Sequence, residues 1–163
     1  MPWTHYHLMA VACLTLLFPS VHQQPGQVCR NQNTRAVDAD QTRAWQAFRQ
    51  SADQAAMRPV VGVWVTVQTH PQTGAVSTQH WSYEASGLVQ YQDQICGTVA
   101  GLPCSQNGGH GYWAARKQPD GSTLMWVNFS DLNRSDACAS SSFRFQDRNT
   151  IVNAWGGVSR RVQ

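Results

Sequence analysis

Four titratable side chains in the middle of the chain could support acid–base chemistry: His80, Glu84, Asp93 and His110. His80 and Glu84 share a face of a predicted strand, which would allow a histidine–carboxylate pair to move protons. Such groups more often form a solvated outer face, and the chain contains no G-x-S-x-G nucleophile motif. We therefore expect no enzyme, no catalytic residue and no cofactor, and a hydrolase or isomerase is the least favoured interpretation.

The cysteines are the next group with possible chemistry. Cys13 lies in a predicted export signal, whereas Cys29, Cys96, Cys104 and Cys138 form an even set. In an exported protein this set indicates two disulfides, and four cysteines allow three connectivities. The short segment between Cys96 and Cys104 is the easiest to close, which favours that bridge and leaves Cys29 with Cys138. A metal cluster is the alternative. The chain has no C-x-x-C pair and no histidine at ligand spacing, so we expect no metal.

Aromatic residues could form a binding site. Seven tryptophans are many for 163 residues, and five of them fall on predicted strands. If several face inward, a small barrel has an aromatic interior that can hold one apolar ligand. Alternatively, the same residues fill the core. The candidate ligand-binding residues are Trp64, Trp81, Tyr83, Tyr91, Trp113 and Trp126.

A Gly-rich segment, 97–111, is predicted to be a long loop stiffened by the nearby cysteine bridge. Loops on a rigid scaffold often carry function, and Asn107, His110 and Tyr112 are the candidate partner-binding residues. The alternative function is therefore a protein-binding inhibitor or immunity-type protein that acts through this loop. A purely structural connection, with glycines chosen for turns, is the other interpretation.

Strands must position most of these residues. Between Pro59 and Thr69, four valines alternate with Gly62, Trp64 and Thr66, which predicts a strand that is covered on both faces. Segment 130–141, which holds Cys138, is expected to be a loop. Seven or eight strands with tight turns predict an all-β, antiparallel, up-and-down barrel. The further predicted strands are 76–84, 88–95, 112–118, 123–129, 142–146 and 151–162.

A helix precedes the first strand. Apolar residues recur at helical spacing between Asp38 and Met57. Asp38 or Asp40 can cap the start, and Pro59 stops the helix. We expect Trp45 and Phe48 to cover one face of the first strand; a loosely attached surface helix is the alternative that periodicity alone leaves open.

The beginning of the chain resembles an export signal. An apolar run at 8–21 has the length of a signal core and is short for a spanning helix. We expect a signal peptide at 1–22, a polar tether at 23–37 held only by Cys29, and one domain at 38–163. The protein should then be secreted or periplasmic, without a membrane span after signal removal. Only 13% of residues are charged, and the net charge is +3, which does not support a nucleic-acid partner.

Gly62-Val63-Trp64 matches the G-x-W motif of lipocalin-like (calycin) domains. The chain resembles these small secreted β-barrels over 59–163, although it is short for one and lacks their C-terminal helix. The resemblance implies that an arginine near the end of the last strand packs over Trp64. Arg160 or Arg161 could do so, and we expect Arg160. The resemblance and the aromatic residues together predict an exported, non-enzymatic protein that takes a small apolar ligand into its barrel.

Overall fold

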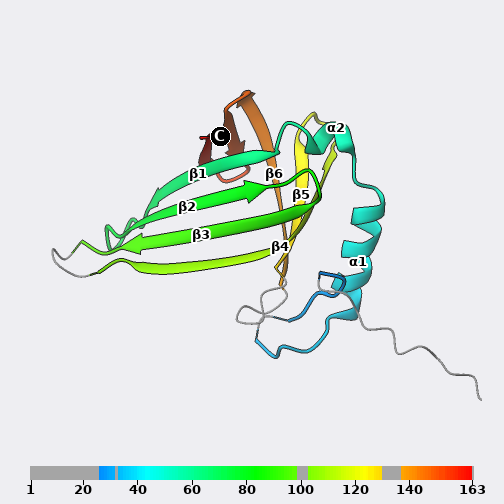
Figure 1. The fold of residues 1–163 in the computed structure, drawn as a ribbon, viewed down its shortest axis with the longest axis horizontal. Helices are drawn as coiled ribbons and strands as arrows, with labels where there is room; N and C mark the ends of the chain where they lie inside the picture. The colour runs from blue at the N-terminus through cyan, green and yellow to red at the C-terminus, as the bar shows by residue number, and fades with distance from the viewer. Residues whose placement is uncertain (1–25, 32, 99–102, 130–136, 163) are drawn as a thin grey trace, which may run out of the picture.

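A computed structural model of the chain describes residues 26–31, 33–98, 103–129 and 137–162. Eight antiparallel strands follow one another in chain order and close into a barrel, because β8 pairs with β1 (Figure 1). The prediction of an all-β, up-and-down barrel is confirmed. The strands are β1 (Gly62–Thr69), β2 (Val76–Tyr83), β3 (Leu88–Cys96), β4 (Ser105–Lys117), β5 (Thr123–Phe129), β6 (Cys138–Asp147), β7 (Thr150–Asn153) and β8 (Val158–Arg161).

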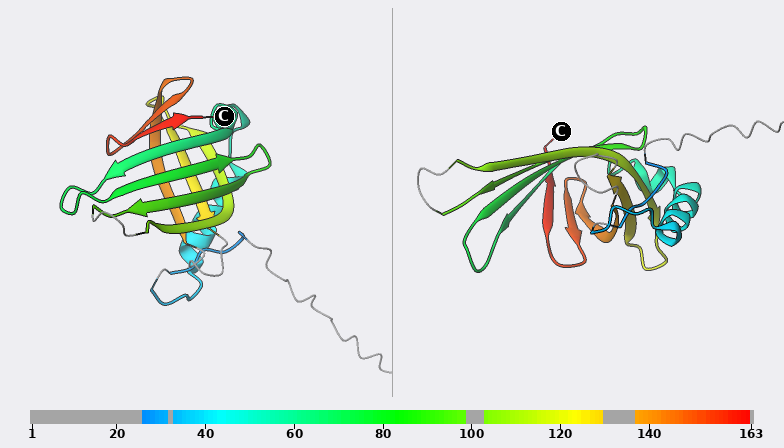
Figure 2. Two further views of the ribbon diagram at one scale, coloured as in Figure 1. Left: turned by 60° about the vertical axis from the view of Figure 1, so that its left-hand side comes forward. Right: turned by 90° about the horizontal axis from the view of Figure 1, so that it is seen from below.

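The barrel is uneven in length. Strands β1 to β4 form one broad, curved sheet, and β5 and β6 cross behind it (Figure 2). The left-hand ends of β1 to β4 extend well past the remaining strands (Figure 1). The main apolar core lies between the two sides of the barrel and includes Trp64, Val89, Trp113, Val127 and Phe143. This arrangement is compatible with the lipocalin-like resemblance.

Two helices precede β1 where one was expected. They are α1 (Ala39–Gln50) and α2 (Gln54–Met57). Asp38 caps α1 by accepting a 2.9 Å hydrogen bond from the backbone N–H of Gln41. Asp53 interrupts the predicted single helix, because its own N–H donates to the carbonyl of Ala115 on β4 (2.9 Å) while its side chain caps α2.

Helix α1 packs against β4 and β5, so the expectation that it covers the first strand was wrong. The rings of Trp45 and Phe48 stack on Trp126 of β5 at centroid distances of 6.4 and 5.6 Å. Ala114, on the outer face of β4, belongs to the same cluster. Its small side chain gives the helix room there, and Trp126 supplies the aromatic surface against which Trp45 and Phe48 stack.

The segment before α1 is more than a tether held at Cys29. Asn128 of β5 is fully buried and donates through its side-chain amide to the carbonyls of Gly26 (3.1 Å) and Val28 (2.8 Å). The indole N–H of Trp45 also donates to Gly26 (2.7 Å). These bonds hold the described part of the segment, which begins at residue 26, against the outer wall of the barrel.

Both favoured disulfides are present. Cys29–Cys138 joins the segment before α1 to the first residue of β6, across 109 residues of sequence. Cys96–Cys104 joins the last residue of β3 to the residue before β4, at a sequence separation of eight. Cys138 therefore begins a strand rather than lying within a loop, since β6 extends from Cys138 to Asp147.

The end of the chain forms two strands instead of one. Residues 151–162 were expected to be a single closing strand, but a turn at 154–157 separates β7 from β8. The side chain of Asn153 organises this turn by accepting from the N–H groups of Trp155 (3.0 Å) and Gly157 (2.7 Å). Gly156 has φ +80°, a conformation that glycine adopts without strain.

Candidate functional site: a cavity inside the barrel

The interior of the barrel contains a cavity of about 280 Å³. It reaches the surface beside Gln68 and Trp155, which are both exposed, and it extends inward to the buried Trp64. Side chains from both sides of the barrel line it. The large apolar ones are Trp64, Trp81, Tyr83, Met125, Val127, Phe129, Phe143 and Ile151.

Trp64 closes the inner end of the cavity. Its ring is 1% exposed, and its indole N–H donates to the carbonyl of Val60 (2.7 Å). The guanidinium of Arg161 lies 4.4 Å from the centroid of the ring and also donates to the carbonyls of Pro59 and Val61. The expectation of Arg160 was wrong, because the β1–β8 register pairs Trp64 with Arg161.

Five of the six predicted ligand-binding residues lie inside the barrel, but only three line the cavity. Trp64, Trp81 and Tyr83 contact the open space. Tyr91 stacks behind Trp81 at 5.2 Å, and Trp113 packs edge-on against Tyr83 at 5.1 Å. These two residues support the wall of the cavity from behind.

Trp126 is not brought together with the others. It belongs to the outer face of β5 and stacks against α1. Alternation along β5 separates Trp126 from Met125 and Val127, which line the cavity. Alternation along a strand shows that these residues lie on opposite faces, but it does not reveal which of the two faces is inside the barrel.

Sequence reasoning missed the polar part of the cavity. Gln68 and Gln79 line it near the opening, and Asn153 joins them from β7. Two hydroxyls, of Thr66 and Ser159, pair within it at 2.6 Å. Gln68 and Thr66 share the face of Trp64 on β1, so alternation from Trp64 was the signal that could have identified both.

Trp155 lies at the rim rather than on a strand. It belongs to the turn between β7 and β8, is 81% exposed and still contributes to the lining of the cavity. A large exposed aromatic beside the opening of a pocket can contact whatever enters it.

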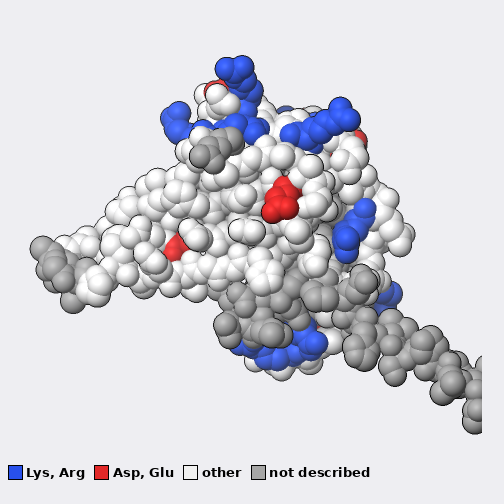
Figure 3. All heavy atoms as spheres, viewed as in Figure 1, with Lys and Arg blue, Asp and Glu red and all other residues white. Residues whose placement is uncertain are grey.

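The electrostatic character of the site is neutral. None of the described residues that line the cavity is charged or a histidine. Burial raises the pKa of Tyr83 above its ordinary value, so its hydroxyl stays protonated at neutral pH. The described parts of the hairpin tips beside the opening (69–76, 96–98, 103–105 and 153–158) contain no Lys, Arg, Asp or Glu. On the face drawn in Figure 3, the described surface of the long sheet carries few charged side chains.

The predicted loop at 97–111 is mostly strand. β4 begins at Ser105, so Asn107, His110 and Tyr112 pair with β3 as regular strand residues. Gly111 is required by close approach, because a Cβ there would lie 2.1 Å from the carbonyl oxygen of Asn128. Tyr112 is half-buried beneath Arg49. The structure therefore does not gather these three residues on a loop, and residues 99–102 lie outside its description.

The titratable candidates are dispersed. His80 and His110 are exposed on the outer faces of β2 and β4, where they lie across from Gln92 and Gln90. Glu84 follows β2 and accepts a hydrogen bond from the hydroxyl of Ser86 (3.0 Å). No hydrogen bond or ion pair between His80 and Glu84 occurs in the described structure.

Asp93 shares the side of β3 that carries Tyr91, and it accepts from the hydroxyl of Ser77 (2.7 Å). Its carboxylate is thus engaged near the barrel opening without lining the cavity.

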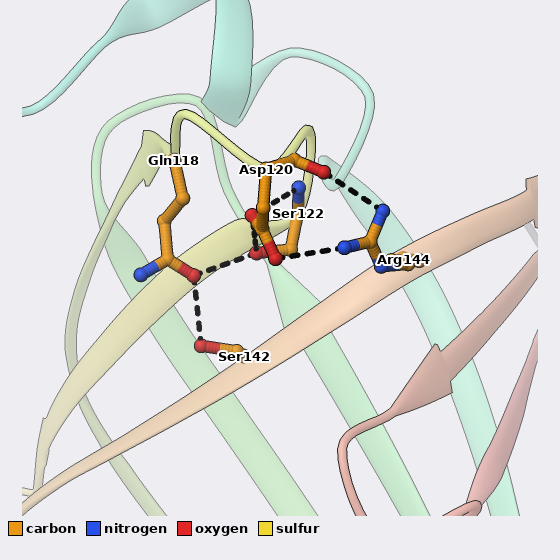
Figure 4. A network of polar contacts seen from close by, with 5 residues as sticks. All are labelled: Gln118, Asp120, Ser122, Ser142 and Arg144. Atoms are coloured by element: carbon orange, nitrogen blue, oxygen red, sulfur yellow. Dashed lines mark hydrogen bonds and ion pairs between the residues drawn. The ribbon is translucent and has the colours of Figure 1, made fainter.

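A second polar cluster lies outside the barrel, at the turn between β4 and β5 (Figure 4). Asp120 accepts from the hydroxyl and N–H of Ser122 (2.6 and 2.9 Å) and forms an ion pair with Arg144 of β6 (2.7 Å). Gln118 joins Ser122 to Ser142 by hydrogen bonds of 2.6 and 3.0 Å. The members bond to one another beside a surface pocket of about 300 Å³, and their bonds tie the turn to β6.

The described residues contain no group of three or more His, Cys, Asp and Glu side chains that could hold a metal ion. Within the same part of the chain, no helix has the length and apolar character needed to cross a membrane. Neither a family model, nor a curated protein, nor a solved structure matches this chain.

Proposed function

We propose that this protein binds one small, mainly apolar molecule inside its barrel. The observation that carries the proposal is the cavity that Trp64 closes at one end and that Trp81, Tyr83 and Phe129 wall with aromatic surface. Small-molecule sites are typically concave and mostly apolar, with a few polar groups that fix orientation. The indole N–H of Trp64 is satisfied by the backbone, so its ring can face an apolar ligand without a polar group left unpaired.

The volume of the cavity limits the size of the ligand. At about 280 Å³ it lies near the lower end of ligand pockets, roughly 300–1,000 Å³. A dry protein cavity of roughly 150 Å³ is known to hold benzene. A ligand with a body of about two fused rings is therefore the size that this interior supports.

We also infer that the protein is exported. Two disulfides suit an extracellular or periplasmic protein, because such bonds persist in oxidising compartments. The predicted signal at 1–22 lies outside the described residues. Mass spectrometry of the protein from its own source tests this inference by showing where the mature chain begins. An uncleaved cytosolic protein with free thiols would contradict it.

Native mass spectrometry of the protein purified from its own source tests the proposed function. We expect one small molecule of uniform mass per chain. A stoichiometric protein partner without a small molecule would instead support the inhibitor or immunity-type alternative.

A pair of variants tests whether the cavity is the binding site. Gln79→Trp places a large ring in the cavity, whereas His80→Trp places the same ring on the outer face of β2. With naphthalene as the probe in equilibrium dialysis, we expect the first variant to lose at least tenfold in affinity and the second to match the unmodified protein. No retention of naphthalene by the unmodified protein, or equal loss in both variants, would contradict binding in the barrel.

A further inference from the structure

The cavity has a polar end as well as an apolar one. Gln68 on β1 and Gln79 on β2 are diagonal neighbours, since Gln68 pairs with Ser77 and Gln79 lies two residues farther along β2. Both line the cavity together with Asn153 of β7. Three carboxamide side chains therefore lie toward the opening, while Trp64 and Phe143 lie among the buried residues of the core.

The two glutamine amides have unused hydrogen-bonding capacity. No hydrogen bond between described residues uses the side chain of Gln68 or of Gln79. Asn153 differs, because its Oδ1 already accepts from the N–H groups of Trp155 and Gly157. Its Nδ2 group is thus the part that it can offer as a donor, while each glutamine offers both a donor and an acceptor.

The cavity lacks a countercharge. No Lys, Arg, His, Asp or Glu is found among the described residues that line it. Arg161 lies against Trp64 and is engaged by the carbonyls of Pro59 and Val61, and the carboxylate of Asp93 is engaged by Ser77. Beside Gln68 and Gln79, an ionised group would give up part of its hydration without gaining an opposite charge, which is unfavourable.

We propose that the ligand is an uncharged molecule with a planar apolar body and one amide, carbonyl or hydroxyl group. The body lies against Trp64 and Trp81, and the polar group is bound by the amides of Gln68 and Gln79 near the opening. This inference rests on the proposed function and narrows it, because it excludes carboxylate and ammonium ligands of the same size. A neutral hydrogen-bonding group is recognised by such amides without the desolvation of a charge.

Four probes that share one ring system test the proposal by equilibrium dialysis at pH 7. They are naphthalene, naphthalene-2-carboxamide, naphthalene-2-carboxylate and 2-naphthylmethylammonium, each quantified by its ultraviolet absorbance. We expect the carboxamide to bind at least tenfold more tightly than either ion and several-fold more tightly than naphthalene.

A matched pair of variants assigns the preference to the amide. Gln79→Leu removes the amide from the cavity, and Gln92→Leu makes the same change at an exposed position on the outer face of β3. We expect Gln79→Leu to bring the affinity for the carboxamide within about twofold of that for naphthalene. Gln92→Leu should leave both affinities unchanged.

The outcomes separate the two proposals. Retention of naphthalene with equal affinity for carboxamide and carboxylate would overturn the inference about the ligand and leave the proposed function standing. Tighter binding of either ion would also overturn it. Retention of none of the four probes would instead refute the proposed function itself.

Discussion

The contact between Trp64 on β1 and Arg161 on β8 can be tested for the stability that it adds where the first and last strands meet. Arg161→Ala removes a guanidinium that lies 4.4 Å from the centroid of the ring, together with its hydrogen bonds to Pro59 and Val61. Trp64→Ala removes a ring that is 1% exposed. Arg160 is the matched control, since it is the adjacent arginine on β8 and is exposed across from Val65.

The expected magnitudes follow from burial. Truncation of Trp64 should lower the free energy of unfolding by about 3–5 kcal/mol, as for a large aromatic in a core. The cation over the indole contributes roughly 0.5–2 kcal/mol, depending on desolvation. Loss of Arg161 should cost this amount and about 1–3 kcal/mol more from its hydrogen bonds to backbone carbonyls. Arg160→Ala should stay within about 0.5 kcal/mol of the unmodified protein.

Urea unfolding with the disulfides intact measures these energies in a double-mutant cycle. We expect the Trp64–Arg161 cycle to show a coupling energy of about 0.5–2 kcal/mol and the Trp64–Arg160 cycle to show none. If Trp64→Ala does not fold, Trp64→Phe keeps an aromatic ring and allows the same cycle at smaller magnitude. Zero coupling with Arg161, or equal coupling with both arginines, would refute a stabilising contact between the guanidinium of Arg161 and the ring of Trp64.

Further expectations concern the disulfides, the rim and the response to pH. Replacing Cys29 and Cys138 by alanine should cost about 5 kcal/mol from the entropy of a 109-residue loop, against about 2.5 kcal/mol for the eight-residue bridge, as measured by urea unfolding. The side chain of Trp155 is 81% exposed at the opening, so Trp155→Ala should change the free energy of unfolding by less than about 0.5 kcal/mol. The same variant should bind naphthalene more weakly in dialysis. Unchanged binding would exclude a contact between Trp155 and the ligand. Hydrogen bonds from Ser122, first from its hydroxyl, lower the pKa of Asp120 in the folded protein. The carboxylate therefore contributes its full stabilisation above pH 3.8, and this stabilisation is lost as the pH falls through the lower pKa of the folded state. Acid unfolding of Asp120→Asn checks the sign, because the variant should lack this pH-dependent loss of stability.

Local features of the sequence were sufficient for much of the fold. Alternation of apolar residues predicted β5 at its observed bounds, and β2 and β3 within one residue of theirs. The cap at Asp38 and the helix end before Pro59 depend on neighbours a few residues away, as does the short bridge between Cys96 and Cys104. A pattern can predict these features because the atoms that decide them are close in the chain.

The same local reasoning misjudged the Gly-rich start of β4. Glycine at 108 and 111 indicated a loop, whereas the observed strand uses glycine because backbone atoms of neighbouring strands approach closely. Whether such a segment becomes loop or strand depends on a ladder partner that lies elsewhere in the chain.

Alternation in the sequence shows which residues share a face of a strand, but packing between distant segments determines which face is the interior. Trp126 and Val127 alternate as predicted, yet Trp126 lies outside because α1 packs on that side of β5. Arg161 rather than Arg160 meets Trp64 because the pairing of β1 with β8 sets the register across 97 residues of sequence. Gln68 and Gln79 share strand faces with Trp64 and Trp81 in the sequence, and closure of the barrel is what turns those faces inward. Period-two alternation is the same for either choice of face, so packing between distant segments must break that symmetry.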